Sequence, residues 1–261
     1  MEEKEIPIVW YKLRGLGLVC LCSLVFFIGA LVTEQKSIAV SSTPQEVLAP
    51  VCSVETEQKK AALTFDVDLS NENTQTILNI LEKYSVKATF FVTGTWVGKY
   101  PEEVKKIAAA GHDLGNHGRN HVDMSVLDRS QIQQEIQQVH MAVQELTGLE
   151  MNLFRAPYGA YGEELLKTVE LSGYLPVQWE IDTEDWKNYG IDSILRKVSQ
   201  PDGKKNGSII RMHNGADYIT QALEPVIISL QEQGYELVPV SRMVYWSDYR
   251  IDGNGRQCRS Y

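Results

Sequence analysis

Short apolar segments alternate with helix-like segments along most of the chain, beginning at Lys60. This alternation constrains the fold most, because strands separated by helices pair side by side in a parallel sheet. The helix-like segments carry apolar residues at helical spacing. The expected strands are 61–65, 88–92, 112–116, 175–179, 208–212 and 236–240, and the expected helices are 74–84, 101–110, 131–146, 163–171, 191–198 and 221–231.

The length of this alternating region favours an α/β barrel. Roughly seven strand–helix units are present, enough to close or nearly close a barrel of parallel strands. An open doubly wound sheet is the alternative. No G-x-G-x-x-G sequence follows the first expected strand, so a dinucleotide-binding fold has little support.

An apolar segment long enough to cross a bilayer, residues 15–32, precedes the alternating region. Lys12 and Arg14 come before it, which predicts a cytoplasmic amino terminus at residues 1–14. We therefore expect a single-pass anchor in the cell membrane. A cleaved signal peptide is the alternative, although only a weak cleavage sequence follows at residues 37–39.

The region after the apolar segment, residues 33–59, is rich in Ser, Thr, Gln and Pro and is expected to be an extracytoplasmic linker. Two cysteines, Cys52 and Cys258, flank the alternating region. They could form a disulfide across the closing ends of a barrel, or remain two unpaired thiols. The formal net charge of −9 argues against a nucleic-acid partner, because phosphate binding needs a basic surface.

Polar residues follow nearly every expected strand, where α/β barrels carry their chemistry. His117 and His121 have i, i+4 spacing, so on one helical turn both imidazoles could bind one divalent ion. His213 has the side chain of a general acid, and Asp185 or Asp182 could orient it. The residues singled out at the strand ends, most of them polar, are Asp66, Asp68, His117, His121, Arg155, Pro157, Tyr158, Asp182, Asp185, Trp186 and His213.

These residues fall into motifs that resemble those of the carbohydrate esterase family 4 polysaccharide deacetylases, also called the NodB-homology domain. The resemblance covers residues 60–245, leaving 246–261 as a tail, and is closest to the sporulation-associated branch. The matching motifs, in the family's order, are Thr64-Phe65-Asp66-Val67-Asp68, His117-Gly118-Arg119-Asn120-His121, Arg155-Ala156-Pro157-Tyr158-Gly159, Asp182-Thr183-Glu184-Asp185-Trp186 and Ile210-Arg211-Met212-His213.

The resemblance implies a distorted (β/α)7-type barrel, a divalent metal ion of the Zn type and a polysaccharide substrate, with no known protein partner. It implies that Asp66 is the general base, that Arg155 holds it, and that His213 is a general acid tuned by Asp185. It implies that His117 and His121 bind the metal, and we expect Asp68 to be the third ligand; without it, the two histidines alone would bind the ion more weakly. Substrate contacts fall to the Tyr158 backbone N–H, a Trp186 wall, Pro157, Ile210 and Asp182.

Departures from the family pattern weaken parts of this assignment. Val67 stands where the family carries a metal-binding aspartate, and Asp68 is the nearest substitute. Gly118 replaces Ser or Thr, which is expected to loosen its loop. Arg211 replaces an apolar residue of the acetyl pocket, and Asn214 replaces an aspartate.

The expected function is hydrolysis of N-acetyl groups of GlcNAc or MurNAc in peptidoglycan, or of a chitin-like glycan. A barrel that binds glycan or assists cell-wall assembly without catalysis is the alternative from another class. An O-deacetylase or another amide hydrolase of similar fold is a third.

Overall fold

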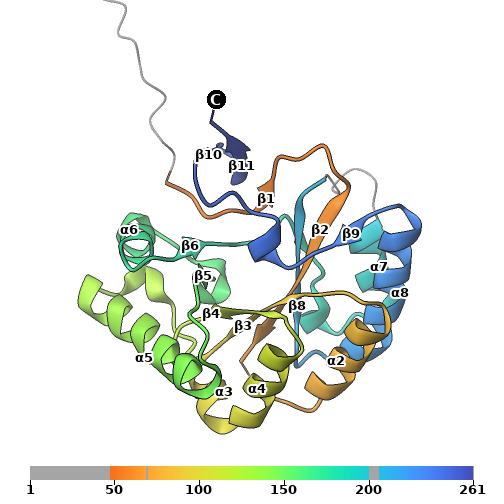
Figure 1. Ribbon diagram of the computed structural model, residues 1–261, viewed down its shortest axis with the longest axis horizontal. Coiled ribbons are helices and arrows are strands. Elements are labelled where there is room, and N and C mark those ends of the chain that lie inside the picture. Colours follow the sequence, from red (N-terminus) through yellow and green to blue (C-terminus); the bar gives the residue numbers. More distant parts are fainter. Residues whose placement is uncertain (1–47, 69, 200–205, 261) are drawn as a thin grey trace, which may run out of the picture. The chain divides into compact units, whose positions relative to one another are not determined.

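A computed structural model describes residues 48–68, 70–199 and 206–260 (Figure 1). The expected cytoplasmic segment, membrane anchor and most of the linker lie outside these residues. Within the described part of the chain, no helix combines the length and the apolar composition needed to cross a membrane.

Parallel strands form the centre of the fold, in the order β6-β5-β4-β3-β2-β8-β7, and helices cover their outer side (Figure 1). The fold is thus an α/β barrel of distorted shape, as expected. These strands are β2 (Lys60–Val67), β3 (Thr89–Val92), β4 (Asp113–Asn116), β5 (Leu153–Phe154), β6 (Leu175–Pro176), β7 (Ile181–Asp182) and β8 (Ser208–His213), and β9 (Glu236–Leu237) pairs with the start of β2. The helices are α2 (Thr74–Lys83), α3 (Gly94–Lys99), α4 (Pro101–Ala109), α5 (Arg129–Thr147), α6 (Glu163–Leu171), α7 (Ile191–Ser199) and α8 (Ile219–Glu232).

Residues on both sides of the expected domain complete the sheet. β1 (Ser53–Val54) pairs antiparallel with β8, and Val51 just before it forms a parallel bridge with Val177 after β6. This segment therefore spans the gap between the two ends of the strand row. The expected tail forms β10 (Tyr249–Ile251) and β11 (Arg256–Arg259), and β11 pairs with β1. The folded unit is thus wider than residues 60–245.

Strand alternation divides the core into two layers. Leu63, Phe65 and Val67 of β2 point toward the helices and belong to the larger apolar cluster. Ala62 belongs to a second cluster on the other face of the sheet. Asp66 lies on that face too, because successive side chains of a strand point to opposite sides. The carboxyl end of the inner face is consequently polar, and this places the site.

Cys52 and Cys258 are free thiols, so the possible disulfide is not formed. The β1–β11 register explains why, because Ser53 is paired with Arg256. Cys52 therefore lies opposite Gly255, three residues along β11 from Cys258. Three residues of strand span about 10 Å, beyond the reach of a disulfide.

Gly115 of β4 is required by close packing against Phe91. An added Cβ at Gly115 would lie 2.4 Å from the Phe91 ring. We expect Gly115→Ala to lower the free energy of unfolding by about 1–3 kcal/mol, the usual cost of overpacking. Urea unfolding followed by circular dichroism measures this. Gly98→Ala in α3 is the matched control, because no atom lies within 4 Å of its Cβ and alanine favours helix. Equal stability of both variants would contradict the packing argument.

Candidate active site

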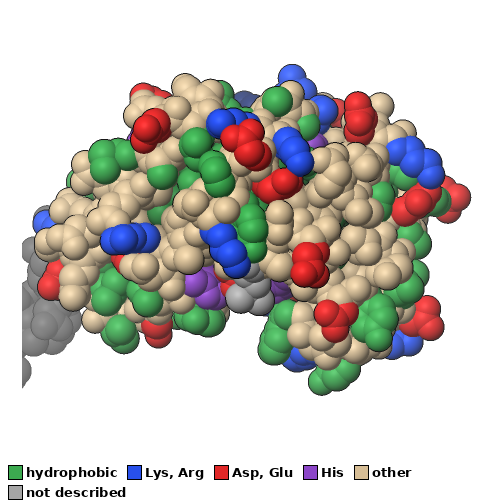
Figure 2. All heavy atoms as spheres, turned by 90° about the horizontal axis from the view of Figure 1, so that it is seen from below, with side chains coloured by type: hydrophobic (Ala, Val, Ile, Leu, Met, Phe, Trp, Pro, Cys, Tyr) green, Lys and Arg blue, Asp and Glu red, His purple; other side chains and the backbone are tan. Residues whose placement is uncertain are grey.

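A cavity of about 510 Å³ opens where the carboxyl ends of the strands meet. Figure 2 shows histidine side chains beside a hollow in one face of the molecule. The cavity is lined by Asp66, Asp68, His117, His121, Tyr158, Trp186, Asn188, Arg211, His213, Gly215 and Ala216. Residues far apart in sequence therefore converge on one space, as the strand-end pattern predicts.

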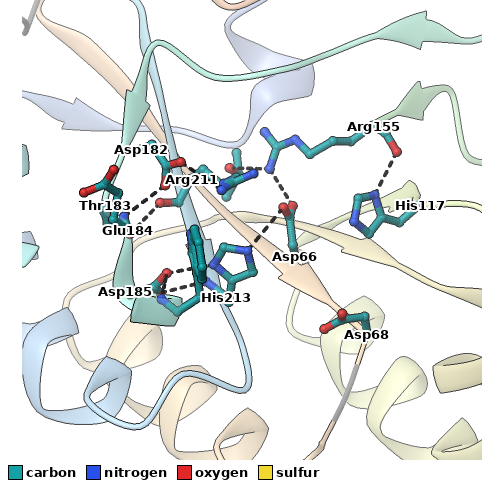
Figure 3. Close-up of polar contacts among 12 residues, drawn as sticks. Asp66, Asp68, His117, Arg155, Asp182, Thr183, Glu184, Asp185, Arg211 and His213 are labelled. Atoms are coloured by element: carbon teal, nitrogen blue, oxygen red, sulfur yellow. Dashed lines mark hydrogen bonds and ion pairs between the residues drawn. The ribbon is translucent and has the colours of Figure 1, made fainter. Parts of the chain in front are cut away.

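Asp66 at the end of β2 is held by a fully buried arginine. Arg155 donates from Nη1 to Asp66 Oδ1 at 2.7 Å and to Thr64 Oγ1 at 2.9 Å, and from Nη2 to the carbonyl oxygen of Gln178 at 2.9 Å. Burial alone would raise the pKa of Asp66, but the charge of Arg155, with His117 and His213, holds it well below its ordinary range. Asp66 therefore stays ionised and anchored, with Oδ2 directed toward His213 (Figure 3).

Asp68, His117 and His121 face one another across the cavity. The imidazole centroids are 5.0 Å apart, and Asp68 Oδ2 lies 3.6 Å from His121 Nδ1. Asp68 shares the face of Asp66 because it is two residues further along, whereas Val67 is buried in the core. Among the described residues, however, no group of three His, Cys, Asp or Glu side chains is already arranged as a metal site.

The two histidines converge for a different reason from the one expected. The sequence suggested a helical turn, but residues 117–123 form an irregular loop, and His121 has a left-handed backbone with φ of 51°. The side chain of Glu135 on α5 accepts hydrogen bonds from the backbone N–H groups of Arg119 and Asn120. Gly118, also left-handed, donates to Asn116 Oδ1. This loop is anchored to both β4 and α5, and the expected loosening at Gly118 stays a prediction.

His117 has the protonation that a metal ligand needs. Its Nδ1 lies 2.8 Å from the carbonyl oxygen of Arg155, which requires Nδ1 to be the N–H donor. Nε2 is then a lone-pair acceptor, and it is buried with no hydrogen-bond partner. Burial also lowers the pKa of the His117 imidazole to about 4, so the ring stays neutral at pH 7. This unsatisfied atom fits a cation, with His121 and Asp68 as further donors.

Two hydrogen bonds to Asp185 hold His213 at the end of β8. His213 Nδ1 lies 2.7 Å from Asp185 Oδ1, and the His213 backbone N–H donates to Oδ2 at 2.8 Å. Burial lowers the pKa of His213, but the hydrogen bond to Asp185 and the charges of Asp66 and Asp185 outweigh it and raise the pKa above 6.5. Nε2 lies 4.0 Å from Asp66 Oδ2. Of the two candidates for orienting this ring, Asp185 is therefore the one in place.

Asp182 pairs instead with Arg211, at 2.8 Å between Oδ2 and Nη2. The Arg211 guanidinium lies over the Trp179 ring, 3.6 Å from its centroid. Ile210 is fully buried in the larger apolar cluster, so its expected contact with substrate is wrong. Strand alternation explains this, because Ile210 faces the helices while Arg211 and His213 face the cavity.

Two exposed aromatic residues form rims of the cavity. Tyr158, in the turn η2 (Pro157–Gly159), has a left-handed backbone with φ of 60° and ψ of 1°, and its hydroxyl donates to the His121 carbonyl oxygen at 3.0 Å. Trp186, in η3 (Asp185–Lys187), is 53% exposed. Pro157 is buried beneath the turn and does not line the cavity.

Comparisons with known proteins assign the chain to a family. The family model for polysaccharide deacetylase matches residues 53–177. The chain is 31% identical over 204 residues to the peptidoglycan-N-acetylmuramic acid deacetylase PdaA of Bacillus subtilis, covering 75% of each chain. The chain belongs to the polysaccharide deacetylase family. It is accordingly a hydrolase of carbohydrate esterase family 4.

Two further relatives of this deacetylase bear on its function. The peptidoglycan-N-acetylglucosamine deacetylase PgdA of Listeria monocytogenes is 32% identical over 77% of this chain and 42% of its own length. A family 4 pseudoenzyme from Bacillus anthracis has a solved structure with a TM-score of 0.72, 29% identity, and coverage of 82% of this chain and 74% of that chain. The fold is therefore shared by active and inactive relatives. The sporulation-associated branch stays a prediction.

Several residues of the deacetylase site were not expected there from the sequence, and Asn214 was noted only as a departure from the family pattern. Asn188 lines the cavity from a left-handed position after η3. Trp179 supports Arg211 from the segment after β6, and Glu135 holds the histidine loop from α5. Asn214 donates from Nδ2 to the Ser70 carbonyl oxygen and so ties the end of β8 to the loop after Asp68. Only the finished fold brings these residues to the site.

Asp185→Asn should lower the pKa of His213, because it removes the charge that favours the imidazolium. NMR titration of the His213 ring measures this. A histidine with a raised pKa adds stability that is complete below its unfolded value and is lost as pH rises through the folded value. The variant should therefore lose more thermal stability at pH 5.5 than at pH 9. Asp217→Asn, an exposed carboxylate, is the control. An unchanged His213 titration would refute the assignment.

Proposed function

We propose that the chain is a metal-dependent N-deacetylase of cell-wall polysaccharide that releases acetate from acetamido sugars. The observation that carries the proposal is the pair of opposed proton-transfer groups in one cavity. Asp66, ionised and held by Arg155, faces His213, held by Asp185, with 4.0 Å between Oδ2 and Nε2. One group can accept a proton and the other can donate one, as amide hydrolysis requires.

A divalent cation, of which Zn²⁺ suits the donors best, would be held by His117, His121 and Asp68. Two imidazoles and one carboxylate with an open position are a common donor set of catalytic zinc. The buried, unsatisfied Nε2 of His117 supports this choice. The bound cation would supply Lewis acidity, which raises the acidity of water and polarises a carbonyl.

The chain's own residues would divide the remaining work. Asp66, whose pKa is held low by Arg155, would accept the proton of the attacking water. Arg155 keeps its carboxylate in place during that transfer. The Tyr158 backbone N–H would stabilise the oxyanion that develops as water attacks the acetyl carbon. His213 then donates its Nε2 proton to the departing amine, with Asp185 stabilising the imidazolium.

The substrate is proposed from the relatives and from the expected location. Both PdaA and PgdA carry names that specify N-acetylated sugars of peptidoglycan. The expected anchor at residues 15–32 would place the domain outside the cytoplasm, beside that polymer. Exposed Trp186 and Tyr158 offer apolar surfaces of the kind that sugar rings contact.

A second candidate is a barrel that binds glycan without hydrolysing it. Burial of Val67 at the position of the missing aspartate favours it, as does the inactive relative with the same fold. The two candidates differ in one measurable outcome. The catalytic one predicts acetate release, and the binding one predicts glycan retention without acetate.

Asp66→Asn should lower kcat for acetate release from muropeptides or chitooligosaccharides by about 10²–10⁴, the usual contribution of a general base. Removal of metal by a chelator should abolish activity, and added Zn²⁺ should restore it. His117→Ala should also lose metal, measured by elemental analysis. Asp217→Asn is the control. Full activity of Asp66→Asn would exclude its role as base, and metal-loaded protein that retains glycan without acetate release would favour the second candidate.

The anchor gives a further expectation. Cells expressing the full chain should carry it in the membrane fraction, resistant to washing with high salt and released by detergent. Replacing two apolar residues, Leu24 and Phe27, by Asp should release it, because central acidic residues disfavour insertion. Recovery of a shortened soluble form from unaltered cells would instead support a cleaved signal peptide.

A further inference from the structure

Arg211 places a positive charge in the wall of the catalytic cavity. It lies on β8 two residues before His213, and strand alternation points both side chains toward the cavity. Arg211 is only 8% exposed, so its charge is almost fully withdrawn from bulk solvent. Figure 3 shows it between Asp182 and Asp66.

The guanidinium of Arg211 has donors left over. Nη2 donates to Asp182 Oδ2 at 2.8 Å. The other oxygen of Asp182 accepts from the Glu184 backbone N–H, so both oxygens of that carboxylate have a partner. Nε of Arg211 is buried without a partner. A guanidinium carries five N–H groups, and a single hydrogen bond leaves most of the planar fork available.

Trp179 fixes the plane in which these donors lie. Its ring is 3.6 Å from Arg211 Cζ, a stacking distance. The same indole lies close to Gly159, where an added Cβ would be 2.8 Å from Trp179 Cη2. The guanidinium is therefore a rigid part of the cavity wall, clamped between an aromatic ring and a carboxylate.

The proposed hydrolysis does not explain this charge. The charge of Arg211 partly offsets the rise in the His213 pKa that Asp185 and Asp66 cause, and so opposes the protonated state that a general acid needs. An anion bound beside Arg211 would offset this effect. A planar carboxylate suits the guanidinium fork, because two parallel N–H···O bonds can form.

We propose that Arg211 is a carboxylate-binding subsite of the catalytic cavity and directs the enzyme toward acetylated sugars that carry a carboxylate. This inference rests on the proposed deacetylase function. The carboxylate has two possible sources, the substrate sugar and the released acetate. Both are recognised by the same donors, and separate measurements distinguish them.

Two matched glycans test whether the carboxylate belongs to the substrate. One is a fragment rich in N-acetylmuramic acid, and the other is the same fragment with its carboxylates converted to methyl amides. The ratio of their kcat/KM values is the readout. The wild-type enzyme should prefer the acidic glycan, and Arg211→Met should reduce that ratio about tenfold or more, equivalent to about 1.4 kcal/mol. Arg211→Lys should keep part of the preference. Arg129→Met, which removes an exposed ion pair with Glu164 outside the cavity lining, is the matched control.

Inhibition by sodium acetate, compared with sodium chloride of equal ionic strength, tests whether Arg211 binds the released acetate. A tenfold rise in the acetate inhibition constant in Arg211→Met, without a change in the substrate ratio, would assign the subsite to the product and overturn the substrate preference. A ratio and an inhibition constant that both match wild type would overturn the subsite itself.

Two further measurements keep the proposal testable. If Arg211→Met does not fold, the double variant Asp182→Asn/Arg211→Met removes both charges of the pair and is assayed in the same way. Binding of acetate can also be followed by tryptophan fluorescence, since Trp179 lies under Arg211. This needs no turnover, so acetate affinity that is equal in wild type and variant would overturn the subsite even in an inactive protein. Loss of acetate release from both glycans in wild type would refute the deacetylase function alone.

Discussion

The buried side chain of Arg155 is the interaction on which the site depends. Its guanidinium holds Asp66 and Thr64 of β2 and the backbone after β6, and lies 4.1 Å over the Phe91 ring. Its carbonyl oxygen fixes the tautomer of His117. One residue at the end of the two-residue strand β5 therefore orders both the proton acceptor and a metal-binding imidazole. Loss of one partner of such a buried ion pair typically costs about 3–5 kcal/mol.

Much of the fold could be predicted because long strands and amphipathic helices carry a clear period. The expected helix at residues 131–146 lies within α5, and the expected first strand lies within β2. Strands of two residues, such as β5 and β7, are too short to carry a period, and tertiary pairing alone defines them. The same holds for β1, whose apolar residues are few and whose partners lie at the other end of the chain.

The sequence predicted which residues form the site better than it predicted how those residues are arranged. Strand-end position correctly grouped Asp66, His213 and the two histidines in one cavity. It could not choose between Asp182 and Asp185 for orienting His213, because that choice depends on a hydrogen bond between separate elements. The helical reason for pairing His117 with His121 was wrong, although the rings do face each other. Loops at strand ends follow local turns, whose shape depends on residues elsewhere such as Glu135.

Three of the six described non-glycine residues with left-handed backbone line the cavity. They are His121, Tyr158 and Asn188. Such conformations cost about 1–3 kcal/mol each and persist only where surrounding contacts enforce them. The rigid barrel beneath supplies those contacts, so the mouth holds its side chains in orientations that an isolated loop would not keep.

The segment of Val51 and β1, which spans the gap between the two ends of the strand row, matters for any shortened form of this protein. Val51 accepts a hydrogen bond from Gln178 and donates one to Pro176, and Val54 donates to the Gly207 carbonyl. A chain cut at Lys60, where the alternation of strands and helices begins, would lose these hydrogen bonds and leave two strand edges unpaired. Bare edges recruit strands from neighbouring molecules. By covering these strand edges, the few residues ahead of residue 60 disfavour pairing between molecules.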